Sequence, residues 1–179
     1  MQKKASQPFW KKENRVGKIN KKYLMEDKFI KEILSSSKTI AMIGVSSVKK
    51  DDPSSIKRRP SIIVMQYLQE FGYRVVPVNP FAVGKKINGE NVVAQLEDIS
   101  IPIDIVDVFR PSSETPKIAQ EAIKVGAKSI WLQYGIHNEE TEAMVKKANI
   151  NYVSNKCIKQ EYQRLFLKMN PVFPMLKNN

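Results

Sequence analysis

Short apolar runs alternate with longer amphipathic segments along most of this chain. Residues 39–45 form a nearly continuous apolar run, which is typical of a strand buried on both faces of a parallel sheet. Residues 60–71 follow with helical spacing, from a proline in the first turn to a stop at Gly72. Because strand and helix keep alternating, the pattern predicts an α/β domain with helices on both faces of its sheet.

The strand-like segments are, in chain order, residues 39–45, 73–78, 103–109, 128–133 and 150–153. Helices are expected at residues 23–34, 60–71 and 113–125, from 138 onward, and at 158–168. We expect a Rossmann-like, doubly wound, parallel five-stranded sheet with strand order 3-2-1-4-5. Ligands bind such sheets at the carboxyl ends of the strands, here where the connections after the first and fourth strands diverge. Function should therefore lie on the loops after Gly44, Val78, Phe109, Gln133 and Val153.

The second strand ends in Val78, Asn79 and Pro80, without an acidic residue. Dinucleotide enzymes usually place Asp or Glu at this point, where it accepts hydrogen bonds from the adenosine ribose. The nearest downstream charges are Lys85 and Lys86, which suit a ligand with an additional phosphate.

Pro77 lies within this strand and cannot donate to the sheet. We therefore expect regular pairing on its side of the strand to stop by Pro77. The binding loop would then begin at Val78.

The loop after the first strand lacks a glycine-rich phosphate motif, since Gly44 has no glycine partners nearby. No side chain obviously caps the helix that starts at Pro60. The backbone N–H groups of Ser61, Ile62 and Ile63 could therefore meet an anion. The alternative is that water and nearby serine hydroxyls satisfy these donors.

Polar residues elsewhere lack a catalytic pattern. Asp104 and Asp107 are three residues apart in one strand, so they should point to opposite faces and serve as hydrogen-bond acceptors, not as an acid/base pair. Arg110 could pair with Asp107 or with a ligand phosphate. His137 is expected at an exposed position, and packing is the expected role of Cys157, although a helix N-terminus could lower its pKa. We expect neither catalytic residues nor a metal site.

The basic excess is concentrated near the N-terminus. The net charge is +12, of which residues 1–59 contribute sixteen basic minus six acidic, or +10. We expect a basic arm over residues 1–20, one domain over 21–170 and a tail over 171–179. The arm is expected to be solvated, or to contact RNA, a membrane surface or an acidic partner. The single cysteine and the absence of an apolar leader predict a cytoplasmic protein.

Six motifs occur in an ordered series, at residues 39–46, 59–61, 72–80, 104–110, 131–136 and 157–162. In this order they resemble the small, stand-alone CoA-binding domain proteins of bacteria, over about residues 25–168. That family is similar in fold to the N-terminal domain of the succinyl-CoA synthetase alpha subunit. The chain departs from it in a longer loop at residues 48–58 and in the basic arm.

The resemblance implies that coenzyme A lies across the carboxyl ends of the strands. Its pyrophosphate would lie near residues 44–47 and 59–61, its adenosine against residues 78–80, and its pantetheine near residues 109–110 and 133–135. Lys85 is a candidate for the 3′-phosphate. The candidate ligand-binding residues are Gly44, Val45, Ser46, Ser47, Arg59, Pro60, Ser61, Val78, Asn79, Pro80, Lys85, Phe109, Arg110, Gln133, Tyr134 and Gly135.

No motif matches the phosphohistidine of the synthetase, so the resemblance implies binding of CoA or an acyl-CoA by a non-catalytic, accessory or regulatory module. The alternatives are an NADP-linked oxidoreductase or another nucleotide-binding protein, and a nucleic-acid-binding protein that acts through the arm. A homodimer is also compatible with the sequence.

Overall fold

The computed structural model describes residues 16–45 and 59–168, with side chains from residue 23 onward. Five strands form one parallel sheet in the order β2-β1-β5-β6-β7. Their bounds are β1 (Thr39–Ile43), β2 (Arg74–Val78), β5 (Ile105–Val108), β6 (Ser129–Leu132) and β7 (Asn151–Val153). The predicted α/β class and the parallel, doubly wound sheet are confirmed.

The segment beside β2 differs from the prediction. Residues 103–109 were expected outside β2, but β5 pairs with β1, where Met42 lies opposite Asp107. The outer edge of β2 instead carries one parallel bridge, between Val78 and Val93. Counted with this bridge as the third strand, the sheet has the Rossmann-like order 3-2-1-4-5, with β7 added at the far edge. The switch point therefore lies between β1 and β5.

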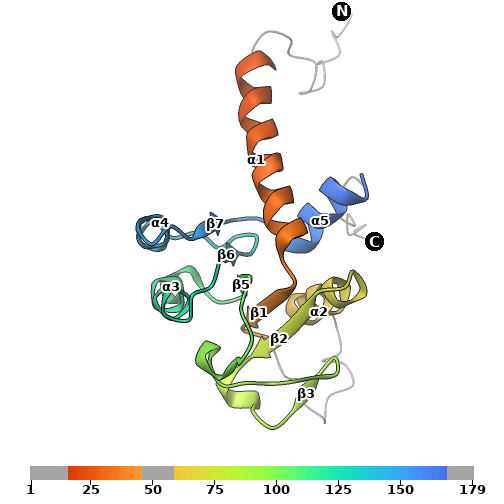
Figure 1. Cartoon of the computed structure of the whole chain (residues 1–179), viewed down its shortest axis with the longest axis vertical. Coiled ribbons are helices and arrows are strands. Elements are labelled where there is room, and N and C mark those ends of the chain that lie inside the picture. Colours follow the sequence, from red (N-terminus) through yellow and green to blue (C-terminus); the bar gives the residue numbers. More distant parts are fainter. Residues whose placement is uncertain (1–15, 46–58, 169–179) are drawn as a thin grey trace, which may run out of the picture.

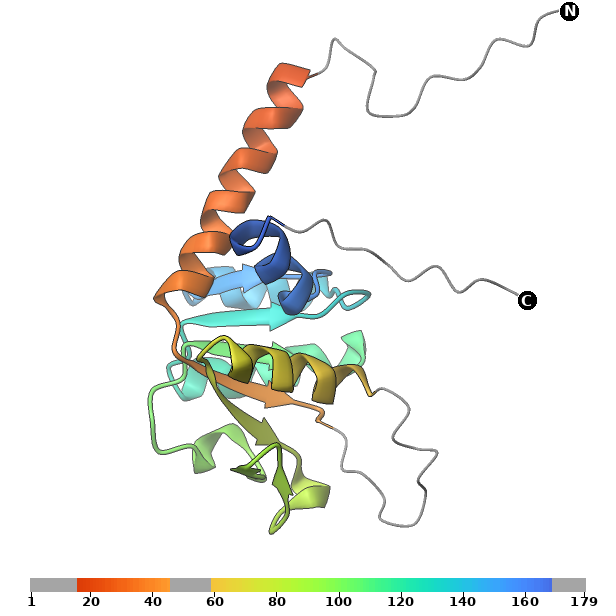
Figure 2. The same cartoon turned by 90° about the vertical axis from the view of Figure 1, so that its right-hand side faces the viewer.

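Helices cover both faces of the sheet (Figure 1). On one face lie α1 (Val16–Ser36), α2 (Pro60–Glu70) and α5 (Ile158–Phe166), and on the other α3 (Thr115–Lys124) and α4 (Glu139–Lys147). α1 begins before the expected residue 23 and extends beyond the sheet (Figure 2). No helix in the described part of the chain has the length and apolar character needed to cross a bilayer.

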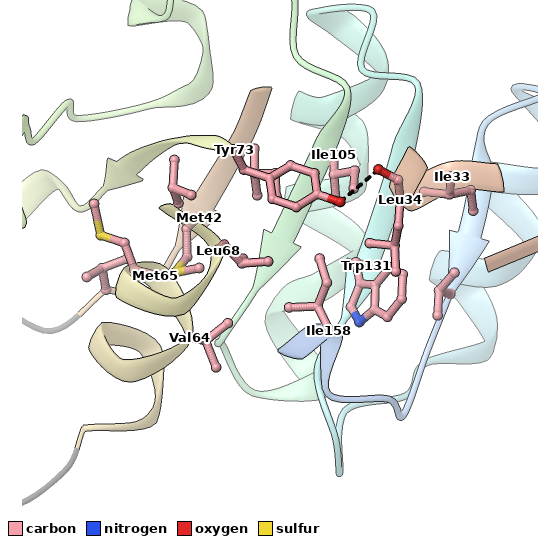
Figure 3. Close-up of a cluster of buried hydrophobic side chains, with 14 of the residues drawn as sticks. Ile33, Leu34, Met42, Val64, Met65, Leu68, Tyr73, Ile105, Trp131 and Ile158 are labelled. Atoms are coloured by element: carbon pink, nitrogen blue, oxygen red, sulfur yellow. Dashed lines mark hydrogen bonds between the residues drawn. The ribbon is translucent and has the colours of Figure 1, made fainter. Parts of the chain in front are cut away.

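The core under α1, α2 and α5 is shown in Figure 3. Tyr73 donates its hydroxyl to the carbonyl of Leu34 at 2.8 Å, which joins the end of α1 to the start of β2. Trp131 is fully buried, and its Nε1 donates to the Lys156 carbonyl at 2.7 Å. These bonds satisfy the polar atoms of large aromatic side chains, so their apolar surface is buried without an unpaired donor.

A hairpin and three short helices in the connections complete the fold. They are η3 (Pro80–Ala82), β3 (Lys86–Ile87), β4 (Glu90–Asn91), η4 (Leu96–Asp98) and η5 (Ser112–Glu114). Asn88 and Gly89 both have positive φ, as a two-residue hairpin turn requires, so the Asn-Gly pair was the signal that could have revealed this hairpin.

Pro77 is accommodated at the outer edge of β2. Its carbonyl accepts a hydrogen bond from Val93 N at 3.1 Å, on the side away from β1, so its missing N–H also faces outward. Pairing with β1 continues to Val78, which lies opposite Ile43. The binding loop therefore begins at Asn79, and the expected start at Val78 was wrong.

Candidate functional site

Gly44 occupies the switch point, where the chain leaves β1 against the end of β5. Its φ is +89°, a conformation that favours glycine. A Cβ at this position would lie 2.8 Å from the carbonyl oxygen of Phe109 and 2.9 Å from Cδ of Arg110. The glycine therefore allows the loop after β1 to pass closely over β5, and the two loops form one surface.

Asn79 ties the end of β2 to this loop. Its Nδ2 donates to the carbonyl of Val45 at 2.8 Å, and its Oδ1 accepts from Phe81 N at 2.9 Å. The first bond needs a donor, which the carboxylate usual at this position in dinucleotide enzymes cannot provide. The missing acid is thus replaced by an amide that holds the β1 loop in place.

Phe81 extends the surface at the end of β2, and it was not among the predicted site residues. It lies in η3 beside Pro80, and 92% of its surface is exposed. Its only signal in the sequence was its position directly after the motif at residues 72–80. Lys85 is also exposed, and its N–H donates to the carbonyl of Ala82 at 3.1 Å, which closes the turn after η3.

The N-terminus of α2 faces the same edge of the sheet. Arg59 is the N-cap residue, and in the described part of the chain no side chain caps this helix, as expected. The N–H groups of Ile62 and Ile63 donate to the Arg59 carbonyl at 3.0 and 3.3 Å, which corrects their assignment as free anion donors. Those bonds do not use the N–H of Ser61, whose residue is buried. Ser46, Ser47 and the 48–58 loop lie outside the described residues.

Arg110 pairs with its own loop. Its Nε and Nη2 each donate to Glu114 at 2.8 Å, and this ion pair is about half exposed. Arg110 therefore does not form the pair with Asp107 that its position in the sequence allowed. A guanidinium held at the end of β5 by a solvent-exposed carboxylate can exchange that partner for a phosphate at modest cost.

The end of β6 divides between the interior and the surface. Gln133 is buried and donates from Nε2 to Oδ1 of Asp107 at 2.7 Å, so this residue of the candidate site faces inward. Tyr134 is exposed. The N–H of Gly135 donates to Oδ1 of Asn155 at 2.8 Å, which joins the loops after β6 and β7.

Asp107 lies within β5, whereas Asp104 precedes that strand, and the two carboxyl groups have different hydrogen-bond partners. Burial alone would raise the pKa of Asp104, but bonds from Lys128 and from the backbone N–H groups of Thr39 and Lys38 outweigh it and lower the pKa. Burial raises the pKa of Asp107 to about 7, because only hydrogen bonds with Gln133 and with the backbone of Val108 act to lower it. Only Asp104 therefore has the partners that a buried carboxylate needs.

His137 lies at the surface and Cys157 packs against the core, as expected. His137 is exposed, with Nδ1 3.3 Å from Oγ of Ser154. Cys157 packs against the core under α2 and α5, and burial raises the pKa of its thiol, so the considered lowering by the helix N-terminus is not realised. Within the described residues, no three His, Cys, Asp or Glu side chains cluster as metal ligands.

The structure thus gathers most of the described candidate residues at one edge of the sheet, on the side to which the strands of Figure 2 point. Asn79 is hydrogen-bonded to Val45, and Phe109 and Arg110 lie against Gly44. Lys85 lies farther out, beyond η3. The site combines backbone, amide and basic groups at this edge, which suit an anionic ligand.

Residues 38–163 match the sequence profile of a CoA-binding domain, and the chain belongs to this family of CoA-binding domains. An uncharacterised Bacillus subtilis protein, YneT, is 39% identical over 130 residues, which cover 73% of this chain and 89% of that protein.

Solved structures have the same fold. A Thermus thermophilus protein, described as cell-free ID.343, is 41% identical with a TM-score of 0.70, over 78% of this chain and 98% of that chain. An acetyl-coenzyme A synthetase of Ca. Korarchaeum cryptofilum is similar in fold, with a TM-score of 0.52 and 21% identity, over 65% of this chain and 26% of the synthetase.

Proposed function

We propose that this protein binds coenzyme A or an acyl-CoA across the carboxyl ends of its parallel strands. The main support is the close approach of Gly44 to Phe109, which brings the loops after β1 and β5 together at the switch point, where sheets of this kind bind their ligands. Family membership supports the same ligand class. The residues at this edge fit an extended phosphate-bearing molecule.

In this proposal the pyrophosphate lies between the β1 loop, residues 44–47, and the start of α2, residues 59–61. The uncapped N-terminus of α2 carries partial positive charge, and the Ser61 N–H and Arg110 add donors. The pantetheine then follows the end of β5 past Phe109 toward residues 133–135. Phe109 is partly buried against the core and offers an apolar contact.

The adenosine lies against the acid-free end of β2, at residues 78–80. Phe81, with its ring almost fully exposed, is well placed to stack on the adenine. Lys85, in the turn after η3, is the candidate contact for the 3′-phosphate that distinguishes CoA from its dephospho form.

We propose an accessory or regulatory role without catalysis, in the cytoplasm. At the candidate site, the described side chains at the strand ends contact one another as structural pairs, such as Asn79 with Val45 and Arg110 with Glu114. Contacts of the basic arm, residues 1–20, with nucleic acid or an acidic partner are a secondary proposal that rests on the charge of the arm.

A thermal-shift titration with CoA, dephospho-CoA, acetyl-CoA, NAD and NADP tests the proposal. A ligand that binds only the folded protein raises its unfolding midpoint by mass action. We expect CoA and acetyl-CoA to raise it, and dephospho-CoA to raise it less. A shift with NADP and none with any CoA species would overturn the proposal in favour of an NADP-linked protein.

A further inference from the structure

Asp107 is fully buried near the carboxyl end of β5. Its Oδ1 accepts the 2.7 Å hydrogen bond from Gln133, but its Oδ2, also buried, has no hydrogen-bond partner among the described residues. A buried carboxyl oxygen without a partner costs free energy of folding. Such a group is therefore more easily explained by binding than by stability.

The register of the sheet places this carboxyl group. Asp107 lies beside Met42 of β1 and Trp131 of β6, and neighbours at one level of a parallel sheet point to the same face. Met42 and Trp131 belong to the core under α2 and α5, and in Figure 3 Trp131 lies next to Ile158 at the start of α5. Asp107 is on this same face, one step beyond Ile105 toward the carboxyl edge.

Cys157 is the N-cap of α5 and packs against the same core as Trp131, the neighbour of Asp107 in the sheet. Burial is the main cause that raises the pKa of its thiol, and the negative charge of Asp107 raises it further. Cys157 is partly exposed, whereas Asp107 and Gln133 are buried. Cys157 is therefore the member of this group that is accessible from the surface.

The three side chains define the chemistry of their ligand. Oδ2 of Asp107 requires a hydrogen-bond donor, and the surrounding apolar core, including the partly buried Phe109, requires a narrow apolar stem. The cysteamine end of coenzyme A has both, with an amide N–H, two methylene groups and a thiol.

We propose that Asp107, Gln133 and Cys157 receive the cysteamine end of coenzyme A, with Oδ2 of Asp107 accepting a hydrogen bond from its amide N–H or its thiol. This inference rests on the proposed function. It adds that the buried acid is retained for the ligand at the expense of the stability of the free protein.

The experiment compares Asp107→Leu with the wild-type chain, by calorimetric titration and by thermal unfolding without ligand. We expect CoA to bind the variant about tenfold more weakly, because a hydrogen bond to a charged group is lost. Adenosine 3′,5′-bisphosphate, which lacks the pantetheine, should bind both proteins equally. The free variant should unfold near the wild-type temperature, because removal of the unpaired Oδ2 is offset by the loss of the acceptor for buried Gln133.

Asp104→Leu is the matched control, because Asp104 lies at the other end of the same segment and has all its partners. It should lower the unfolding midpoint and leave CoA affinity unchanged. Acetyl-CoA separates the two donors, since it keeps the amide N–H and lacks the thiol. If Asp107→Leu weakens both ligands equally, the donor is the amide; if it weakens only CoA, the donor is the thiol.

Alkylation of Cys157, the single cysteine, tests the same site in the unaltered protein. Acetyl-CoA, which has no free thiol to consume the reagent, should slow its reaction with iodoacetamide by about fivefold or more, whereas adenosine 3′,5′-bisphosphate should not. Equal CoA affinity of Asp107→Leu and wild type, or no protection of Cys157 by acetyl-CoA, would overturn this inference alone. No binding of any CoA species to wild type would overturn the proposed function and this inference with it.

Discussion

The side-chain amide of Asn79 donates a 2.8 Å hydrogen bond to the backbone carbonyl of Val45. This bond connects the loops after two neighbouring strands, at the point where dinucleotide enzymes place a ribose-binding acid. The same amide caps η3 through Phe81 N. The end of β2 is therefore shaped by a donor that positions the loop after β1.

Substitution of Asn79 tests this connection. Asn79→Asp keeps the acceptor for Phe81 N but loses the donor, so we expect a loss of about 1 kcal/mol in the free energy of unfolding. Asn79→Ala loses both bonds and should cost about 2 kcal/mol. Urea denaturation measures both values. Equal stability of Asn79→Ala and wild type would show that these bonds contribute nothing.

Gly44→Ala tests the close approach at the switch point. Its Cβ would contact the backbone of Phe109, so the loops must separate, and we expect a loss of about 2–3 kcal/mol and a weaker thermal shift with CoA. Gly72→Ala is the control, because Gly72 has a φ of +90° and no atom within 4 Å of the added Cβ. It should cost only about 1 kcal/mol, from strain of the backbone. Equal losses at the two glycines would contradict the steric role of Gly44.

Lys85→Glu tests the contact with the 3′-phosphate. We expect CoA affinity to fall by about tenfold and dephospho-CoA affinity to change much less, because only CoA carries this charge. Lys117→Glu, on exposed α3 surface of the other sheet face, makes the same change of charge away from the site. Calorimetric titration with both ligands distinguishes the two variants. A similar loss for both ligands in Lys85→Glu would indicate a general effect of charge instead.

The stability of the free protein should depend on pH through Asp107. Burial raises the pKa of this carboxyl from 3.8 to about 7, so between these values the folded state binds more protons than the unfolded state. Stability should therefore fall as the pH rises from about 4 to 7, by up to about 1.4 kcal/mol per pH unit.

Asp107→Asn should remove this fall and make the protein more stable than wild type at neutral pH. Asp104→Asn should instead make the protein less stable than wild type at neutral pH. The pKa of Asp104 is lowered, so its contribution is present above the unfolded pKa and is lost as the pH falls. Urea denaturation at a series of pH values measures both slopes. A wild-type protein with the same slope as Asp107→Asn would contradict the raised pKa.

The strands, the helices and the edge that carries the site could be predicted because their signals are local. Alternation of apolar runs with amphipathic segments depends on neighbours in the chain, and Pro60 and Gly72 mark the ends of a helix by their own backbone preferences. The same holds for the exposed position of His137. The Asn-Gly turn at residues 88–89 is also a local signal, although the hairpin that it forms was not predicted.

The sequence by itself determined the α/β alternation and the acid-free end of β2, because both are written in adjacent residues. Only the tertiary structure decided that β5 lies beside β1, that Asn79 reaches Val45, and that Oδ2 of Asp107 is left buried without a described partner. These relationships join segments far apart in the chain, and they depend on which strand fills each place in the sheet. The end of β2 thus lacks an acid and instead positions the loop after β1 through Asn79.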